Sequence, residues 1–154
     1  DLSYDHKPTD REEAARIRKA GGSVLRGRVG GIVAVSRALG DYAFKVNKEL
    51  GVFEQQICCK PDVTVRERSM DEDEFIVIAC DGIWDVIDSA GVVRYVRTRL
   101  QADPLIDLND ISKGLLDYCL GRGSKDNMTI IIVLFKNGVK LLREEGKRGG
   151  CCLG

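Results

Sequence analysis

The most informative segment of this 154-residue chain reads Glu74-Phe75-Ile76-Val77-Ile78-Ala79-Cys80-Asp81-Gly82. Its residues 75–80 form a continuous apolar run, which is typical of a strand that is buried on both faces. Asp81 comes directly after that run, and Gly82 lets the backbone turn sharply there. The segment therefore predicts a buried strand that ends at a carboxylate.

A second apolar run, residues 130–135, predicts another buried strand, and Asp126 lies shortly before it. If the two strands are antiparallel neighbours, the end of the first lies beside the start of the second. Asp81 and Asp126 would then meet at one rim of the sheet. Carboxylate oxygens on rigid strand ends suit Mg2+ or Mn2+ better than zinc. A purely structural role stays open, because Asp-Gly and Asp-Asn pairs are also common in turns.

Helical patterns flank the two expected strands. The box Thr9-Asp10-Arg11-Glu12 predicts a helix start, and Gly21-Gly22 predicts its end. Apolar residues at helical spacing predict a helix over residues 92–100 and another that opens at Asp103-Pro104. We therefore expect an α/β (α+β) fold, mainly an antiparallel β-sheet with flanking helices.

One domain is expected over residues 1–136, because no repeat, linker or second boundary is visible there. Val63 and Val65 alternate with polar residues, which predicts a half-buried strand. Residues 137–154 are polar and Gly-rich and are expected to form a flexible tail.

Composition argues against several classes of partner. The chain has 24 Lys and Arg against 24 Asp and Glu, a formal net charge of zero. Neither nucleic acid nor an anionic membrane surface is therefore expected as the main partner. The longest apolar runs, residues 75–80 and 130–135, are too short for a transmembrane segment.

The six cysteines do not form a zinc or disulfide pattern. Cys58-Cys59 and Cys151-Cys152 are adjacent pairs, whereas two thiolates that grip one zinc are normally spaced. Free, reduced thiols predict a cytoplasmic protein, with the nucleus as an alternative. The final Cys151-Cys152-Leu153-Gly154 has the shape of a prenylation signal but ends in an unusual residue. Lipid anchoring through Cys151 or Cys152 is thus only an alternative.

Five segments, in order along the chain, carry a resemblance to a known family. Two of them read Asp81-Gly82-Ile83-Trp84-Asp85-Val86 and Gly121-Arg122-Gly123-Ser124-Lys125-Asp126-Asn127-Met128-Thr129. The others are Asp5-His6-Lys7-Pro8, Ala20-Gly21-Gly22-Ser23-Val24 and Ala34-Val35-Ser36-Arg37-Ala38-Leu39-Gly40-Asp41. Together they resemble the motifs of the metal-dependent protein serine/threonine phosphatases, the protein phosphatase 2C family, over residues 2–135.

The resemblance implies a binuclear Mg2+ or Mn2+ centre in which Asp81 and Asp126 are ligands. It also implies that Gly82 and Asn127, the residues next to those ligands, support the site. Asp41, which ends a family motif of its own, is implied in a further supporting role.

The implied reaction is hydrolysis of phosphoserine and phosphothreonine in phosphoprotein substrates. In such a centre the two ions bridge a water, lower its pKa and hold the phosphate oxygens for in-line attack. Arg28 lies in the segment that matches the family's flap, where it would contact substrate. No covalent enzyme intermediate is needed, and no residue of this chain is assigned as catalytic.

The resemblance covers only the back half of the family's catalytic domain, so the missing N-terminal half is an expected partner. That half normally supplies an Asp-Gly-His-Gly-Gly motif with a metal ligand and the proton donor, and this motif does not occur here. The only histidine, His6, is expected to be structural or solvated. Two carboxylates fill few of a hard ion's six or more positions, so the isolated chain is expected to be poorly active.

Two other functions stay open from the sequence. One is a non-catalytic phosphatase-like interaction module, in which Asp81 and Asp126 are relics. The other is a carboxylate metal site of unrelated function at the sheet edge.

By the resemblance, this chain is expected to form half of an α-β-β-α sandwich, which would leave one sheet without its partner. The family's full domain packs two sheets together, and this chain would supply mainly one of them. The unpaired sheet would expose an apolar face, which favours self-association. Nearby, Trp84 is expected in the core beside the site, and Arg94, Arg97 and Arg99 are expected to cover the exposed side of a helix.

Overall fold

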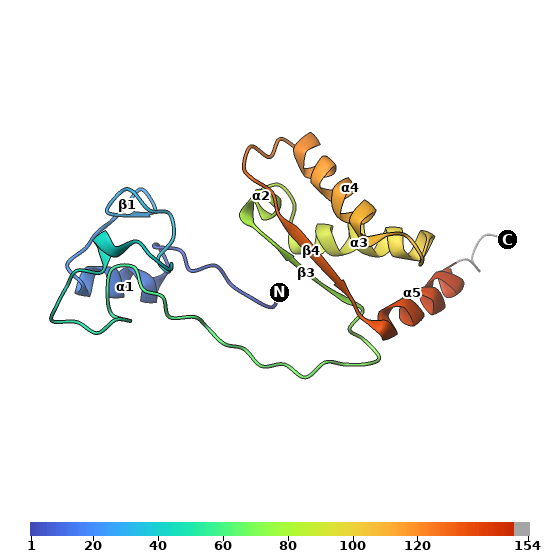
Figure 1. The fold of residues 1–154 in the computed structure, drawn as a ribbon, viewed down its shortest axis with the longest axis horizontal. Helices are drawn as coiled ribbons and strands as arrows, with labels where there is room; N and C mark the ends of the chain where they lie inside the picture. The colour runs from blue at the N-terminus through green and yellow to red at the C-terminus, as the bar shows by residue number, and fades with distance from the viewer. Residues whose placement is uncertain (150–154) are drawn as a thin grey trace. The chain divides into compact units, whose positions relative to one another are not determined.

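The computed structural model describes residues 1–149, and the chain divides into two compact units, Asp1–Val65 and Arg66 onward (Figure 1). Residues 59–68, around the junction, are all exposed and contain no helix or strand. Val63 and Val65 are 81% and 91% exposed, so the strand predicted there is wrong. Alternation alone does not make a strand, because a strand also needs a neighbour to satisfy its backbone hydrogen bonds. The division into two units was not visible in the sequence.

The first unit has a small core that packs against helix α1 (Arg11–Lys19). The helix begins within the box that predicted it and ends just before the two glycines. Ile17 of the helix is completely buried with Val29 and Ile57. These three side chains, from distant parts of the unit, give it a core of its own.

A tight hairpin follows α1. Strands β1 (Val24–Leu25) and β2 (Arg28–Val29) pair in antiparallel fashion across a two-residue turn. Arg26 and Gly27 in this turn have φ values of 51° and 76°, and positive φ at both positions defines a type I′ turn. A short 3-10 helix, η1 (Tyr42–Phe44), completes the regular structure of the unit as described.

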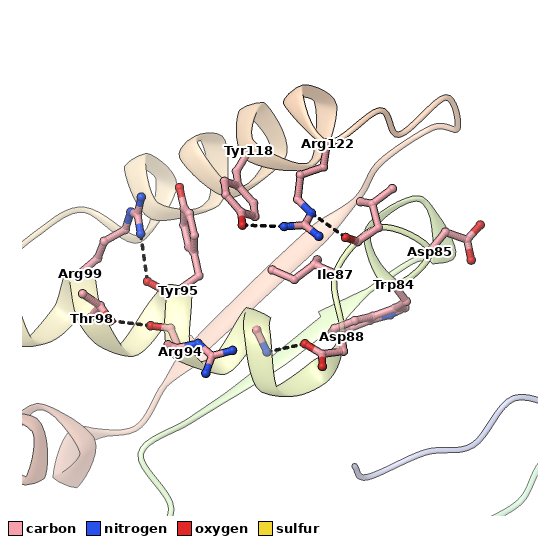
Figure 2. A pocket seen from close by; sticks show the side chains of 12 residues that line it. Trp84, Asp85, Ile87, Asp88, Arg94, Tyr95, Thr98, Arg99, Tyr118 and Arg122 are labelled. Carbon is pink, nitrogen blue, oxygen red and sulfur yellow. Dashed lines mark hydrogen bonds between the residues drawn. The ribbon is translucent and has the colours of Figure 1, made fainter.

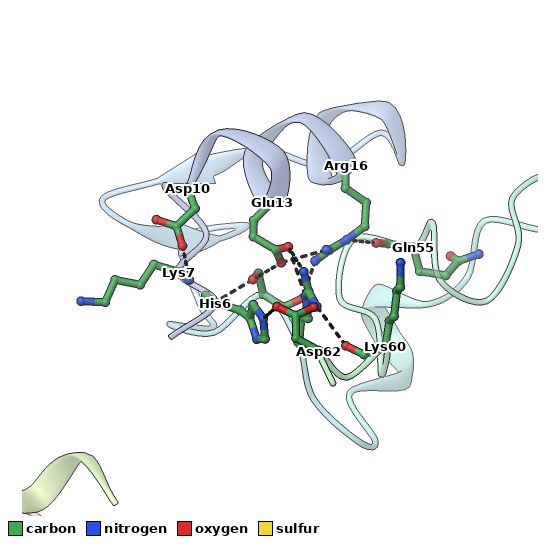
Figure 3. A network of polar contacts seen from close by, with 10 residues as sticks. His6, Lys7, Asp10, Glu13, Arg16, Gln55, Lys60 and Asp62 are labelled. Carbon is green, nitrogen blue, oxygen red and sulfur yellow. Dashed lines mark hydrogen bonds and ion pairs between the residues drawn. The ribbon is translucent and has the colours of Figure 1, made fainter. Parts of the chain in front are cut away.

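A buried ion-pair network connects α1 to the later part of the first unit (Figure 3). Glu13 is 4% exposed, and its carboxylate accepts hydrogen bonds from Arg37 Nη2 at 2.7 Å, Arg16 Nη1 at 2.8 Å and Ser36 Oγ. Burial opposes the charge on Glu13, but these donors outweigh it and lower its pKa to about 2. Arg37 also pairs with Asp62 at 2.7 Å, so the network extends to the end of the unit.

The second unit is a two-stranded antiparallel sheet with helices packed on one side (Figure 1). In chain order its elements are β3 (Phe75–Ala79), α2 (Asp81–Trp84), α3 (Ser89–Ala102), α4 (Leu108–Gly121), β4 (Ile130–Leu134) and α5 (Lys136–Gly149). Phe75 pairs with Leu134 and Ala79 with Ile130, and the register between them is unbroken. The mixed class, with antiparallel strands and flanking helices, confirms the expected fold class.

The two faces of the β3–β4 sheet differ. One face carries Val77 and Ile132 and packs against the core formed with the helices. The other face carries Ile78 and Ile131, which are paired across the strands and are each 56% exposed. The expectation of strands buried on both faces is therefore wrong for this chain, while the expected open apolar face is confirmed.

Two predictions about helices need correction. The second predicted helix does not open at Asp103-Pro104; α4 begins at Leu108, where the Asp107 carboxylate accepts a hydrogen bond from Asn109 N at 2.8 Å. Residues 137–149 were expected in a flexible tail but belong to α5. Leu142 is 1% exposed and joins the main core, so burial of this side chain holds the helix against the unit.

The candidate lipid-attachment residues Cys151 and Cys152 lie outside the described residues. None of the helices in residues 1–149 is long and apolar enough to cross a membrane.

Candidate metal site at the sheet rim

The end of β3 and the approach to β4 run side by side beyond the paired strands. Cys80 N donates a hydrogen bond to Thr129 O at 3.2 Å, which extends the antiparallel register past Ala79 and Ile130. The Cys80 thiol donates to Asn127 O at 3.2 Å and accepts from Thr129 N at 3.2 Å. The predicted meeting of the two segments at one rim is therefore confirmed at the level of the backbone.

The sulfur of Cys80 does more than fill space beside the site. Its hydrogen bond from the Thr129 backbone lowers the pKa of the thiol, although burial opposes this. In the sequence, Cys80 is the last residue of the apolar run 75–80, a pattern that indicates a small apolar side chain at a strand end. Its position directly before the Asp-Gly turn is the only signal that could have indicated a polar contact.

Gly82 allows a very close approach of the two segments. A Cβ atom at this position would overlap the Asn127 carbonyl oxygen and lie 3.1 Å from Met128 Cγ. Ser124 Oγ donates a hydrogen bond to Gly82 O at 2.7 Å from the same loop. The contact between Gly82 and Asn127 therefore sets the spacing of the rim.

Asp81 and Asp126 are both exposed at this rim. Asp81 is the first residue of α2, directly before Gly82, and Asp126 directly precedes Asn127. The Asp126 carboxylate accepts a hydrogen bond from Asn127 N at 2.7 Å, which orients it within its loop. The segments that carry the two carboxylates are thus held next to each other.

The chemistry of these donors fits a hard divalent cation, but their number does not complete a site. Carboxylate oxygens are suitable ligands for Mg2+ or Mn2+, which take six or more positions in total. The described part of the chain contains no cluster of three or more His, Cys, Asp or Glu side chains that could hold a metal. Asp81 and Asp126 can therefore supply only part of a metal site.

The remaining candidate residues belong to the first unit. Arg28 lies in β2, is exposed, and donates from Nη1 to Ile32 O at 2.9 Å. Asp41 is exposed, has a φ of 51° and precedes η1, where its carbonyl accepts a hydrogen bond from Phe44 N. These contacts are all made within the first unit. His6 bonds to Asp62 at 2.8 Å, which agrees with the structural role expected for it.

Trp84 fixes the turn that leads from the strand into α2. Its indole Nε1 donates a hydrogen bond to Ala79 O at 2.8 Å, and its ring packs against the main core. The prediction that Trp84 lies in the core beside the site is confirmed. Its hydrogen bond joins the end of β3 to α2, the helix that begins with Asp81.

Comparison with known proteins agrees with this geometry. The family model described as "Protein phosphatase 2C" matches residues 1–128. Protein phosphatase 1A of Homo sapiens is 44% identical over 147 residues, which cover 96% of this chain and 38% of that protein. Protein phosphatase 1B of Homo sapiens is 45% identical over 146 residues, which cover 95% of this chain and 30% of that protein.

A solved structure shares the fold. The crystal structure of a phosphatase from a pathogenic strain of Toxoplasma gondii matches with a TM-score of 0.78 and 36% identity. The match covers 88% of this chain and 42% of that one. The chain thus spans less than half the length of each of these relatives. Since the family model accounts for residues 1–128 and the fold agrees with it, the chain belongs to the protein phosphatase 2C family.

Proposed function

We propose that this chain is the C-terminal segment of a Mg2+- or Mn2+-dependent protein phosphatase that hydrolyses phosphoserine and phosphothreonine in phosphoproteins. Membership of the protein phosphatase 2C family supports this reaction class. The observation that carries the proposal is the contact of Gly82 with Asn127, because it brings the segments bearing Asp81 and Asp126 together.

In this proposal Asp81 and Asp126 would hold the divalent ions through their carboxylate oxygens. When bound, such ions would supply an activated water and neutralise the charge on the phosphate oxygens. The chain's own contribution is to position the two carboxylates. The Gly82–Asn127 contact and the Cys80 hydrogen bonds fix the backbone from which they project.

The proposal requires ligands from outside this chain. Two carboxylates leave most positions of a six-coordinate ion unfilled. We therefore expect the isolated chain to bind metal weakly and to turn over substrate poorly. The open face of β3 and β4, with Ile78 and Ile131, is the surface that we expect to pack against the remaining half of the catalytic domain.

Restoring the missing half tests the proposal. The N-terminal segment of human protein phosphatase 1A, fused ahead of Asp1, should give Mn2+-dependent hydrolysis of a phosphothreonine peptide. Asp81→Asn in this fusion should lower turnover by about 100-fold or more, since metal-ion catalysis contributes several kcal/mol. Asp71→Asn, which makes the same change at an exposed loop residue, is the matched control and should keep the activity.

The second candidate function is a non-catalytic phosphatase-like interaction module. It is favoured by the lack of a third metal-binding side chain beside Asp81 and Asp126 in the described residues. A fusion that folds and binds Mn2+ but hydrolyses no phosphopeptide would support this function and reject the enzyme.

A further inference from the structure

A groove of about 670 Å3 lies on the helical side of the second unit (Figure 2). Its walls are the connection from α2 to α3, one face of α3, and the C-terminal part of α4. Trp84 and Asp85, at the end of α2, line it, so it begins about one helical turn from Asp81. Its volume lies within the range of protein ligand sites.

The centre of the groove is a row of two arginines and two tyrosines. The guanidinium of Arg99 lies 3.3 Å from the centre of the Tyr95 ring, and the Tyr95 and Tyr118 rings are 5.4 Å apart. Arg122 lies 5.6 Å from the centre of the Tyr118 ring and donates from Nη1 to the Tyr118 hydroxyl at 3.0 Å. Stacking on a ring fixes a guanidinium while leaving N–H groups at its edge available to a ligand.

Contacts with the backbone hold the side chains of this row in place. Arg122 Nε donates to Val86 O at 2.9 Å, and Arg99 Nη1 donates to Tyr95 O at 3.2 Å. Gly114 of α4 provides the room for Tyr95, because a Cβ there would lie 2.8 Å from the Tyr95 hydroxyl. These contacts order the side chains before any ligand arrives, which reduces the entropy lost on binding.

The three arginines of α3 have different contacts. Arg97 does not line the groove; its side chain is 37% exposed and pairs with Glu74 at 2.8 Å. Arg94 and Arg99 line the groove together with Arg122, the C-cap residue of α4. None of these three arginines forms an ion pair with a carboxylate in the described part of the chain. Three positive charges thus face one groove without a counter-charge bound to them.

Two carboxylates share the groove and limit what it can bind. Asp85 and Asp88 both belong to the connection between α2 and α3. Asp88 is engaged as the N-cap of α3, where its carboxylate accepts a hydrogen bond from Gly91 N at 2.8 Å. The positive charge therefore lies on α3 and α4, and an anionic ligand would bind there and avoid the connection.

We propose that this groove docks an acidic segment of a protein partner, whose side-chain oxyanions bind Arg94, Arg99 and Arg122. Arginine, tyrosine and tryptophan are the residues that dominate binding energy in protein interfaces, and all three types line this groove. One guanidinium group can donate two parallel hydrogen bonds to the oxygens of one carboxylate or phosphate. If the proposed phosphatase function holds, this partner is the phosphoprotein substrate. The groove would then bind an acidic segment of the substrate that is separate from the reacting phosphoryl group.

The only tryptophan of the chain, Trp84, lines the groove and reports on its occupancy. The 154-residue chain is titrated with a short polyglutamate peptide in EDTA, while tryptophan fluorescence is recorded. We expect a saturable change that weakens as salt is raised, and no saturable change with the matched polyglutamine peptide. Because the chelator removes metal and no turnover is measured, the result is independent of whether the chain belongs to an active phosphatase.

Variants locate the binding site. Arg94→Gln removes a charge that makes no structural ion pair, and it should weaken peptide binding about three- to fivefold, as expected for one exposed charge pair. Arg94→Glu should weaken it further. Lys136→Gln, which removes one positive charge at the start of α5, is the matched control and should bind like the wild type. Circular dichroism of each variant confirms that its fold is intact.

Three results would overturn the docking proposal. The first is the absence of a saturable change with polyglutamate, and the second is wild-type affinity in both Arg94 variants. The third is inorganic phosphate binding as tightly as the peptide, which would indicate a site for a free anion. A phosphoserine peptide that binds more tightly than polyglutamate would support the proposal and identify phosphate as the preferred oxyanion.

Discussion

At the scale of single residues, the sheet rim depends on side chains that are small or polarisable. Gly82 lets the backbone of Asn127 approach it, and the Cys80 sulfur bonds to both Asn127 and Thr129. Neither residue would ligate a metal itself under the proposed function. They determine instead where Asp81 and Asp126 are placed, so the rim should be sensitive to one added carbon atom.

Gly82→Ala should destabilise the second unit by about 2 kcal/mol, because its methyl group would overlap the Asn127 carbonyl and force the two segments apart. Urea denaturation followed by Trp84 fluorescence measures the loss. Gly121→Ala, at a helical position where a Cβ meets nothing within 4 Å, should leave stability unchanged or raise it slightly. Equal stability in both variants would contradict the close contact.

Glu13 makes the stability of the first unit dependent on pH. Its pKa is about 2 in the folded chain against an ordinary value of 4.5. Since the folded pKa is the lower one, the stabilisation is complete above the ordinary value and is lost as pH falls from 4.5 towards 2. The loss should amount to about 3 kcal/mol. Urea denaturation followed through the methyl NMR signals of Ile17 and Ile57 measures it.

The Glu13→Gln variant is the corresponding test at neutral pH. It leaves Arg16 and Arg37 largely buried without their common partner, and should destabilise the first unit by about 3 kcal/mol or more. It should also remove the Glu13 part of the acid dependence. Glu12→Gln, an exposed neighbour on α1, should change stability by no more than about 0.5 kcal/mol. An unchanged acid profile in Glu13→Gln would argue against the network.

At the scale of elements, the sequence predicted what depends on local pattern and missed what depends on distant partners. The runs at residues 75–80 and 130–135 correctly predicted β3, β4 and the antiparallel contact that brings Asp81 near the start of β4. The strand expected at Val63 and Val65 did not form because no described strand pairs with it. Pattern shows which residues are apolar, but whether they find a neighbour depends on the whole chain.

At the C-terminal helix α5 the sequence pattern missed an element that forms, because its stability depends on a distant contact. Its many charged residues and glycines suggested a tail, yet one side chain, Leu142, is buried in the main core. The pairing of Arg97 with Glu74, next to β3, likewise joins residues that are 23 positions apart. The meeting of the segments that carry Asp81 and Asp126 was predicted, but the contacts of Cys80 and Ser124 at this rim involve residues more than 40 positions apart.

Leu142→Ala should destabilise the second unit by about 2–5 kcal/mol, the usual effect of removing a buried leucine side chain. The measurement is urea denaturation followed by Trp84 fluorescence. Leu105→Ala, at a side chain that is 82% exposed, is the control and should have little effect. A negligible effect at Leu142 would mean that α5 does not contribute to the core in solution.

At the scale of the whole molecule, the chain consists of two units with separate cores and one open sheet face. The first core contains Ile17 and Ile57, and the second is formed by side chains of the helices and of the β3–β4 face that packs against them. Denaturation need not then be a single transition, and each unit requires its own probe. The chain covers only 38% of human protein phosphatase 1A, and a partial catalytic domain is expected to leave a sheet face uncovered. The exposed Ile78 and Ile131 agree with this expectation.

The chain should self-associate through the open face when no other half covers it. Sedimentation equilibrium over a range of concentrations should show oligomers, and Ile131→Lys should weaken the association at least about tenfold by placing a charge in the contact. Leu39→Lys, at an 88% exposed residue of the first unit, should not alter it. A monomer at every concentration would contradict this prediction.

The β3–β4 pair has a further consequence for handling the protein. A sheet of only two strands has no interior strand, so the outer edge of β3 and the outer edge of β4 are both available to other chains in the described structure. Both strands consist of uncharged, mostly β-branched residues without proline, the composition of segments that stack into fibrils. Refolding from denaturant at high concentration would therefore favour fibrous aggregates over native chains. Dilute refolding, or co-expression with a segment that pairs with β3 or β4, would protect these edges.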